Sequence, residues 1–372
     1  MARQADRRRR RTGPLAALAL GAAAVWAVRD VPRQMGARAA GERARRIDAS
    51  PQFSAGKFHN TMPAAQFTAA SVPRLIAASI ADRDRRHPHQ PIPVVRPEIG
   101  GDPDGLYVTW YGHSSALIEI DGRRVLVDPV WSERCSPSRL AGPKRMHEPP
   151  LPLRELPPLD AVLISHDHYD HLDMETIQNL VDLQAAPFLM PLGVGAHLER
   201  WGVPPTRIVE LDWTERATVA GIEFVCTAAR HFSGRGFSRD ETLWSSWVIA
   251  GPSHRAFYSG DTGYIPEFGD IGTQYGPFDV TLVQIGAYGE AWPDIHMVPE
   301  DGVAAHVDVR GGLMVPVHWC TFNLALHDWA EPADRVWREA KARDVSLAVP
   351  RPGERIDVDN PPAVDGWWQA IA

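Results

Sequence analysis

The chain has 372 residues, of which 44% are hydrophobic and 23% are charged. This composition is typical of a folded protein, and it excludes wholesale disorder and a polytopic membrane protein. The three cysteines are too few and too scattered to form a disulfide framework. The formal net charge of −7 argues against a nucleic-acid partner. The sequence leaves the oligomeric state open.

Charge is divided unevenly along the chain. Residues 1–46 contain twelve arginines and three acidic residues, which gives +9, so the remaining 326 residues carry −16. Basic residues 7–11 precede an uncharged run at 14–28 and resemble the start of an export signal. The run of about 15 residues is shorter than the roughly 20 that span a bilayer. We predict membrane association through this segment as a signal anchor. A cleaved signal of an exported protein and a non-inserted tail of a cytoplasmic one are the alternatives.

The rest of the chain divides into three parts. Residues 47–104 form an N-terminal extension, with a helix predicted at 69–81 and a Pro-rich linker that begins at 87. Residues 105–355 form one regular domain, and 356–372 form a C-terminal tail. Within the domain, strands are predicted at 107–110, 116–120, 124–127, 160–165, 222–227, 247–249, 256–258, 280–283 and 313–317. Helices are predicted at 175–183, 298–307 and 332–343. An antiparallel meander followed by mixed strands and helices indicates a layered α/β fold.

The segment from Ser165 to Leu172 has the strongest chemical pattern in the sequence. Within six residues it contains four potential metal ligands, namely His166, His168, Asp170 and His171. Imidazole and carboxylate groups are good zinc ligands, and a catalytic zinc keeps one position open for water. A His-rich polar loop is the alternative, but four ligands in so short a segment favour a metal site.

Three further candidates each follow an apolar strand. His231 follows the strand at 222–227, Asp261 follows 256–258, and His318 follows 313–317. Taken singly, each would more often be a structural residue. Loops at one edge of a sheet converge, however, so these side chains are expected to meet the histidine cluster in one cleft.

The order His-x-His-x-Asp-His, then His, Asp and His resembles the metallo-β-lactamase superfamily. Further segments are similar to the branch typified by N-acylphosphatidylethanolamine-hydrolysing phospholipase D, and the resemblance covers about residues 105–355. These segments lie at 109–115, 136–145, 155–165, 210–213, 259–264, 276–279, 285–288 and 318–322. The resemblance implies an α/β fold of the αββα sandwich type, with two mixed β-sheets flanked by helices.

The resemblance also implies a ligand set for two zinc ions. The first zinc would be held by His166, His168 and His231. The second would be held by Asp170, His171 and His318. Asp261 would bridge both. Iron or manganese could occupy the same nitrogen and oxygen ligands.

In such a site, a metal-bound hydroxide would attack phosphorus. The resemblance therefore gives catalytic roles to Asp170, Asp261 and His296. His296 lies in the segment His296–Glu300, which covers the site in the family, and would contact the substrate phosphate or the leaving-group oxygen. A solvated loop histidine is the alternative for His296. Trp244, Trp247, Trp292 and Trp319 would either line an acyl-chain channel or belong to the core.

The function that the resemblance implies is a phospholipase D-type phosphodiesterase. It would cleave N-acylphosphatidylethanolamine into N-acylethanolamine and phosphatidic acid, with a phospholipid and a membrane surface as its partners. One alternative is a lactonase or small phosphodiester hydrolase that resembles the ascorbate-6-phosphate lactonase-like branch. The non-enzyme alternative is a membrane-tethered binding protein on a decayed hydrolase scaffold, which the complete ligand set disfavours.

Overall fold

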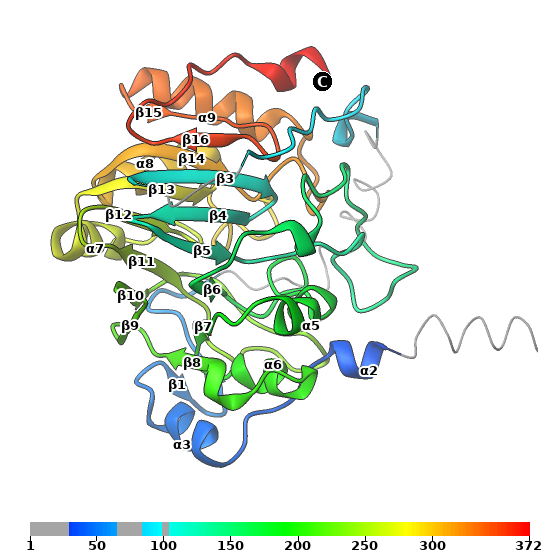
Figure 1. The fold of residues 1–372 in the computed structure, drawn as a ribbon, viewed down its shortest axis with the longest axis vertical. Helices are drawn as coiled ribbons and strands as arrows, with labels where there is room; N and C mark the ends of the chain where they lie inside the picture. Colours follow the sequence, from blue (N-terminus) through cyan, green and yellow to red (C-terminus); the bar gives the residue numbers. More distant parts are fainter. Residues whose placement is uncertain (1–29, 65–83, 99–103) are drawn as a thin grey trace, which may run out of the picture.

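Residues 30–64, 84–98 and 104–372 are described by a computed structural model. They form two seven-stranded mixed sheets that face each other, with helices on the two outer sides (Figure 1). This arrangement confirms the predicted αββα sandwich.

The first sheet begins with the predicted antiparallel meander. Its strands are β3 (Leu106–Gly112), β4 (Ser115–Ile120), β5 (Arg123–Val127), β6 (Ala161–Leu163), β7 (Phe188–Pro191), β8 (Ile208–Leu211) and β16 (Arg355–Asp357). Their order across the sheet is β16-β3-β4-β5-β6-β7-β8. From β5 to β8 the strands are parallel, so the carboxyl ends of these strands lie at one edge.

The second sheet is antiparallel in its first half and parallel in its second. Its strands are β9 (Arg216–Val219), β10 (Ile222–Thr227), β11 (Ser246–Ala250), β12 (Arg255–Tyr258), β13 (Phe278–Gln284), β14 (Gly311–Val317) and β15 (Ser346–Leu347). Their order is β15-β14-β13-β12-β11-β10-β9. The parallel strands β12 to β15 again bring their carboxyl ends to one edge.

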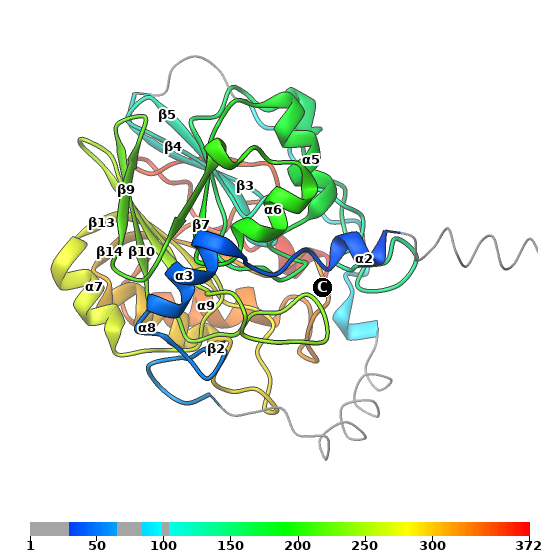
Figure 2. The ribbon, with the colours of Figure 1, turned by 90° about the horizontal axis from the view of Figure 1, so that it is seen from below.

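Helices cover the outer face of each sheet (Figure 2). The first sheet is covered by α5 (Met174–Leu183) and α6 (Gly195–Trp201). The second is covered by α7 (Glu267–Tyr275), α8 (Pro299–Asp308) and α9 (Glu331–Ala342). Short 3₁₀ turns lie at Asp84–Arg86, Leu153–Glu155, Pro205–Arg207 and Trp367–Ala370.

The main core lies between the two sheets. Trp110 and Ile118 of the first sheet belong to the same buried cluster as Phe224 and Trp247 of the second. The indole Nε1–H of Trp247 donates to the carbonyl oxygen of Ile164, 3.1 Å away, and so links the sheets next to the histidine segment. Burial of large apolar side chains at about 25 cal/mol per Å² supplies most of the driving force for this packing.

The predicted strands and helices of the domain are all present, and several short elements were not predicted. Strand β7 has four residues, too few to show a periodicity. Helix α7 contains two glycines, which have low helix propensity, and it is held by the burial of Phe268 and Ile271. The helix predicted at 69–81 lies outside the described residues.

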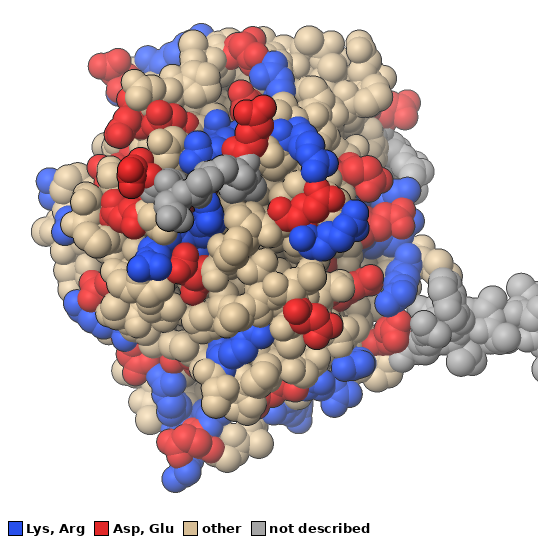
Figure 3. All heavy atoms as spheres, viewed as in Figure 1, with Lys and Arg blue, Asp and Glu red and all other residues tan. Residues whose placement is uncertain are grey.

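The N-terminal segment packs on the sandwich. It forms α2 (Val31–Gln34), α3 (Gly41–Ala49), β1 (Phe53–Ser54) and β2 (Lys57–Phe58). Arg43 of α3 pairs with Glu199 at 2.7 Å and also with Glu210. Arg46 pairs with Glu215 at 2.6 Å. Basic residues of the leader, which is residues 1–46, therefore meet acidic residues of the domain. The face in Figure 3 shows both charge signs intermixed.

The predicted membrane localisation requires correction. Among residues 30–64, 84–98 and 104–372, every helix is too short or too polar to cross a bilayer. The basic run at 7–11 and the apolar run at 14–28, on which that prediction rested, lie outside the described residues.

The C-terminal residues contribute to both a sheet and the core. Strand β16 pairs with β3 in antiparallel fashion. Trp367 and Trp368 are buried, and the Trp368 indole Nε1–H donates to Asp334 at 2.8 Å on helix α9. Residues 356–372, expected to form a tail, therefore pack against the sandwich.

A buried and an exposed phenylalanine provide a test of the packing. Phe257 of β12 is fully buried, with its ring centroid 5.6 Å from that of Phe278 and 6.2 Å from that of Phe268 on α7. We expect Phe257→Ala to lower the free energy of unfolding by about 3–5 kcal/mol, because it leaves a cavity. Phe237→Ala, at a fully exposed position, should change it by less than about 0.5 kcal/mol. Denaturant unfolding measures both, and equal effects would contradict the assigned core.

Candidate metal centre

The candidate ligands lie in loops at one edge of the two sheets. The histidine segment 166–171 follows β6, and His231 follows β10. Asp261 follows β12, and His318 directly follows β14. Because each strand directs its loop to the same edge, side chains far apart in sequence come within a few ångströms of each other.

Three imidazoles form the first group of the site. His166 Nε2 lies 2.9 Å from His168 Nδ1, and His231 Nε2 lies 3.2 Å from the same atom. These three ring nitrogens are close enough to bind a common cation. His166 and His231 are buried and His168 is half-buried.

The second group consists of Asp170, His171 and His318. The carboxylate Oδ2 of Asp170 lies 3.5 Å from His171 Nε2 and 3.3 Å from His318 Nε2. His113, from the turn between β3 and β4, joins this group with its Nε2 2.9 Å from the same Asp170 oxygen. His113 thus makes a hydrogen bond to a candidate ligand.

Asp261 lies between the two groups. Its Oδ2 is 3.9 Å from the Nε2 atoms of both His166 and His231 in the first group. The same oxygen is 3.1 Å from His171 Nε2 and 2.9 Å from His318 Nε2 in the second. One carboxylate is therefore within reach of cations bound at either group.

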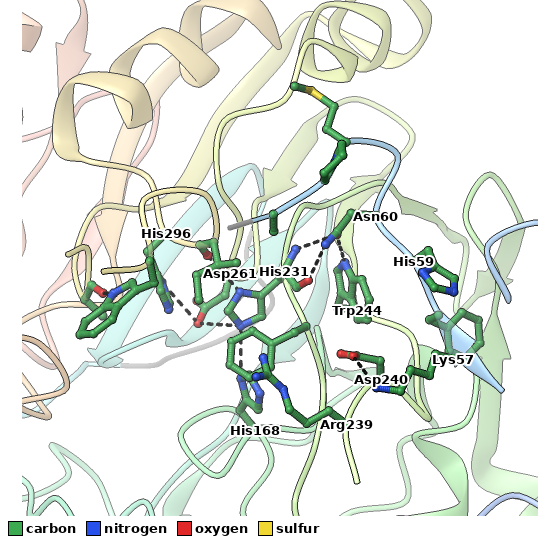
Figure 4. A pocket seen from close by; sticks show the side chains of 18 of the residues that line it. Lys57, His59, Asn60, His168, His231, Arg239, Asp240, Trp244, Asp261 and His296 are labelled. Carbon is green, nitrogen blue, oxygen red and sulfur yellow. Dashed lines mark hydrogen bonds and ion pairs between the residues drawn. The ribbon is translucent and has the colours of Figure 1, made fainter. Parts of the chain in front are cut away.

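His296 lies over the site, as Figure 4 shows. Its Nδ1 is 3.9 Å from Asp261 Oδ2, and its ring centroid is 5.1 Å from that of His231. Burial lowers the pKa of His296 to about 3, although the Asp261 carboxylate acts in the opposite direction. A neutral imidazole therefore borders the pocket at this position.

Hydrogen bonds on the far side of the imidazoles fix their orientation. Nδ1 of His166 contacts the Ser165 hydroxyl at 2.9 Å, and Nδ1 of His171 contacts Asp128 at 2.6 Å. Nδ1 of His231 lies 3.0 Å from the carbonyl oxygen of Ile295. Because Nδ1 of each of these three rings contacts a partner outside the ligand cluster, Nε2 is directed into the site, as is usual for metal-bound histidines.

Asp128 is a supporting residue that sequence reasoning missed. Besides His171, its carboxylate accepts hydrogen bonds from the Ser165 backbone N–H at 2.7 Å, the Ser165 hydroxyl at 2.5 Å and the Tyr258 hydroxyl. The available signal was its position, because Asp128 directly follows the apolar strand β5 at the same edge. It joins the two sheets beneath the second group of ligands.

The backbone is strained at this edge. Asp128, His113 and His318 are not glycine, yet their φ angles are 37°, 51° and 66°. Such left-handed conformations are uncommon for residues with a Cβ and cost of order 1–3 kcal/mol each. The surrounding packing holds them, and two of them direct imidazoles toward Asp170.

The donor set fits a divalent cation. Although buried, His171 Nε2 and Asp261 Oδ1 have no hydrogen-bond partner among the described residues. Nitrogen and oxygen atoms left unpaired in a polar, converging cluster are the groups that a metal ion would satisfy.

The pKa shifts at the site fit cation binding as well. Burial lowers the pKa of His166 and His231 well below the usual value, which leaves neutral imidazoles. Burial disfavours the charged form of His318, but Asp261 and Asp170 raise its pKa to about 8. Burial would also raise the pKa of Asp261, yet His171 and His318 hold it well below its usual range. Ionised carboxylates are thus compensated by protons that a cation would displace.

The site forms the floor of a pocket of about 890 Å³. One wall comes from the N-terminal segment 57–64, which sequence reasoning placed outside the site. Of the four tryptophans considered for an acyl-chain channel, Trp244 and Trp292 line the pocket. Trp247 and Trp319 belong to the core. The remaining lining includes Phe232, Arg239, Ile295 and Leu324.

Known proteins similar to this chain include metal-dependent hydrolases. A family model described as Beta-lactamase superfamily domain matches residues 123–319. An uncharacterized protein of Mycobacterium tuberculosis is 52% identical over 95% of this chain and 96% of its own length. N-acyl-phosphatidylethanolamine-hydrolyzing phospholipase D 1 of Caenorhabditis elegans is 35% identical over 64% of this chain and 71% of its own length.

Solved structures share the fold. A metallo hydrolase from the archaeon Ignicoccus hospitalis aligns with a TM-score of 0.50 and 23% identity. The alignment covers 68% of this chain and 97% of that chain.

Removal of bound metal should destabilise the protein. A cation present at 100 times its Kd would stabilise the folded state by about 2.7 kcal/mol. We therefore expect chelator treatment to lower the melting temperature and added zinc to restore it. His254→Ala is the control, because His254 lies away from the site and pairs with Asp121 at 2.6 Å. This variant should retain the full chelator effect. A melting temperature independent of chelator would contradict a metal centre.

Asp128 should influence metal affinity without binding the metal. We expect Asp128→Asn to weaken metal binding by about 10–100-fold, because the carboxylate no longer orients His171. Asp160→Asn is the matched control, because Asp160 lies at the opposite end of β6 from the site. It is a half-buried carboxylate that accepts a hydrogen bond from the Arg124 backbone N–H at 2.9 Å. Competition with a metal indicator measures both variants. Equal affinities would show that Asp128 has no such role.

Proposed function

This chain is a metallo-hydrolase of the β-lactamase superfamily, and we propose that it is a phosphodiesterase of the phospholipase D type. The proposed substrate is an N-acylated phosphatidylethanolamine, and the products are N-acylethanolamine and phosphatidic acid. The named relative from Caenorhabditis elegans supports this choice of reaction.

The observation that carries the proposal is the position of Asp261 between two ligand groups at the floor of the pocket. We propose that His166, His168 and His231 hold one zinc ion, and that Asp170, His171 and His318 hold a second. Five imidazoles and two carboxylates make zinc the favoured metal. The chemistry that two such cations supply when bound is activation of water and neutralisation of charge on phosphoryl oxygens.

The pocket lining supports an anionic, partly apolar substrate. Arg239 supplies positive charge at the pocket, with its guanidinium 4.1 Å from the centroid of the Phe232 ring. Lys57 also lines the pocket, where it pairs with Asp240 at 3.8 Å. Met62, Trp292 and Leu324 supply apolar surface, since their side chains are exposed or half-buried at the pocket. A phosphodiester that bears acyl chains can contact both kinds of side chain at once. A volume of about 890 Å³ is large enough for a headgroup and the first part of a chain.

His296 is proposed to contact the reacting phosphate. Hydrolysis adds a water oxygen to phosphorus and breaks the bond between phosphorus and the ethanolamine oxygen, which must receive a proton. The imidazole of His296 borders the pocket next to Asp261 and can donate a hydrogen bond to that leaving oxygen or to the phosphoryl group.

A direct assay tests the proposed function. Zinc-loaded protein is incubated with vesicles that contain N-acylphosphatidylethanolamine, and the lipid products are measured by mass spectrometry. We expect N-acylethanolamine and phosphatidic acid to form in equal amounts. His168→Ala should abolish the reaction, because it removes the nitrogen that lies nearest to both other ligands of its group.

The control and the alternative substrates make the assay decisive. His306→Ala changes a buried histidine whose Nδ1 contacts the Thr281 hydroxyl at 2.7 Å, away from the pocket, and should retain the activity if it folds. Water-soluble lactones and small phosphodiesters are assayed in parallel. Turnover of these alone, with the phospholipid left intact, would overturn the phospholipid proposal.

A further inference from the structure

The N-terminal segment Lys57–Ala64 lies outside the part of the chain that matches the family model, yet it forms one wall of the pocket. Within it, Asn60 points toward the site and reaches the main chain of His231, as Figure 4 shows. The two residues are 171 positions apart in sequence.

Asn60 satisfies both main-chain polar groups of His231. Its Nδ2–H donates to the His231 carbonyl oxygen at 2.8 Å. Its Oδ1 accepts from the His231 backbone N–H at 3.0 Å. Such a pair of bonds fixes a peptide position as a neighbouring strand would, and His231 here lies beyond the end of β10.

The amide of Asn60 is held in one orientation. The indole Nε1–H of Trp244 also donates to Asn60 Oδ1, at 2.9 Å. Two donors therefore face Oδ1 and one acceptor faces Nδ2, so a flipped amide would lose all three bonds. Trp244 is almost fully buried, which makes it a fixed support.

The rest of the segment is fixed on both sides of Asn60. The Phe58 backbone N–H donates to the carbonyl oxygen of Asp240 at 2.8 Å, and the Phe58 ring is buried. On the other side, the Arg230 guanidinium donates to the carbonyl oxygen of Pro63. The position of Asn60 is thus set by the sandwich itself.

The consequence for His231 is a ligand held from two directions. Ile295 fixes the ring through Nδ1, and Asn60 fixes the backbone from which the ring projects. The ring Nε2 is then directed at His168 Nδ1, 3.2 Å away. Without Asn60, the backbone N–H and carbonyl oxygen of His231 would be buried and unpaired. The loop that carries His231 would then be free to shift toward a position in which these groups are hydrogen-bonded.

We propose that Asn60 is a positioning residue of the metal centre, and that the segment Lys57–Ala64 completes the site. Asn60 sets the affinity of the cation at His166, His168 and His231 and leaves that of the other cation unchanged. The inference rests on the proposed function, since it takes His231 as a metal ligand.

Metal affinity of the full-length protein tests the role of Asn60. Zinc affinity is measured by competition with a fluorescent chelator for wild type, Asn60→Ala and Asn179→Ala. We expect Asn60→Ala to weaken one of the two bound zinc ions by about 10–100-fold. Asn179→Ala should change the affinity for neither ion, because Asn179 is exposed on α5 and its amide donates to the Glu175 carbonyl oxygen at 2.8 Å, away from the site.

A second variant separates positioning from general stability. Asn60→Asp retains the acceptor for His231 and Trp244 but loses the donated bond, so its zinc affinity should fall between those of wild type and Asn60→Ala. Thermal unfolding is measured with and without zinc. A purely structural role would lower both melting temperatures equally and leave zinc affinity unchanged in both variants, and that result would overturn the proposal.

The readout is independent of catalysis. Zinc titration contains no substrate, so a wild-type protein that binds two zinc ions but leaves N-acylphosphatidylethanolamine intact would overturn only the proposed function. Unchanged zinc affinity in Asn60→Ala and Asn60→Asp would overturn only the role of Asn60.

Discussion

The carboxylate of Asp261 lies within 4 Å of ring nitrogens from both ligand groups, and much of the structure serves to keep it there. Converging lone pairs and buried negative charge repel one another unless cations or protons lie between them. The fold resists this repulsion through partners outside the cluster, among them Asp128 behind His171 and the Ile295 carbonyl behind His231. Strained backbone at Asp128 and His318 belongs to the same arrangement.

The uneven distribution of charge along the chain supports ion pairs between its basic N-terminal residues and the acidic domain. Arg43 and Arg46, which belong to the basic leader, pair with Glu199 and Glu215 of the acidic domain. These pairs, together with the hydrogen bond from the Trp201 indole to the carbonyl oxygen of Arg33 at 2.8 Å, place residues 30–46 along one side of the sandwich. The chain then runs from α3 through β2 to Asn60 at the site. Part of the positive charge of residues 1–46, that of Arg43 and Arg46, is therefore used in intramolecular packing.

Most of the fold could be predicted from the sequence because its main strands are long or strongly apolar. Candidate ligands were recognisable for a similar reason, since His231, Asp261 and His318 each follow such a strand. Residues 356–372 were expected to form a tail because no local periodicity links Trp367 and Trp368 to a core. Their burial depends on contacts with Trp319, which follows β14, and with α9, both of which lie well before them in sequence.

The sequence by itself determined which side chains are available as ligands and at which strand ends they lie, because strand periodicity and ligand chemistry are local properties. Only the tertiary structure decided which of them meet, how closely Asp261 approaches both groups, and that Asn60 and Asp128 support the site. Asparagine is common in loops, so Asn60 carries no local signal that separates a supporting residue from a turn residue. The position of Asp128 after β5 indicates the edge of the sheet but not the partners of its carboxylate. Their roles arise from hydrogen bonds across the fold, whose geometry exists only once the two sheets have packed.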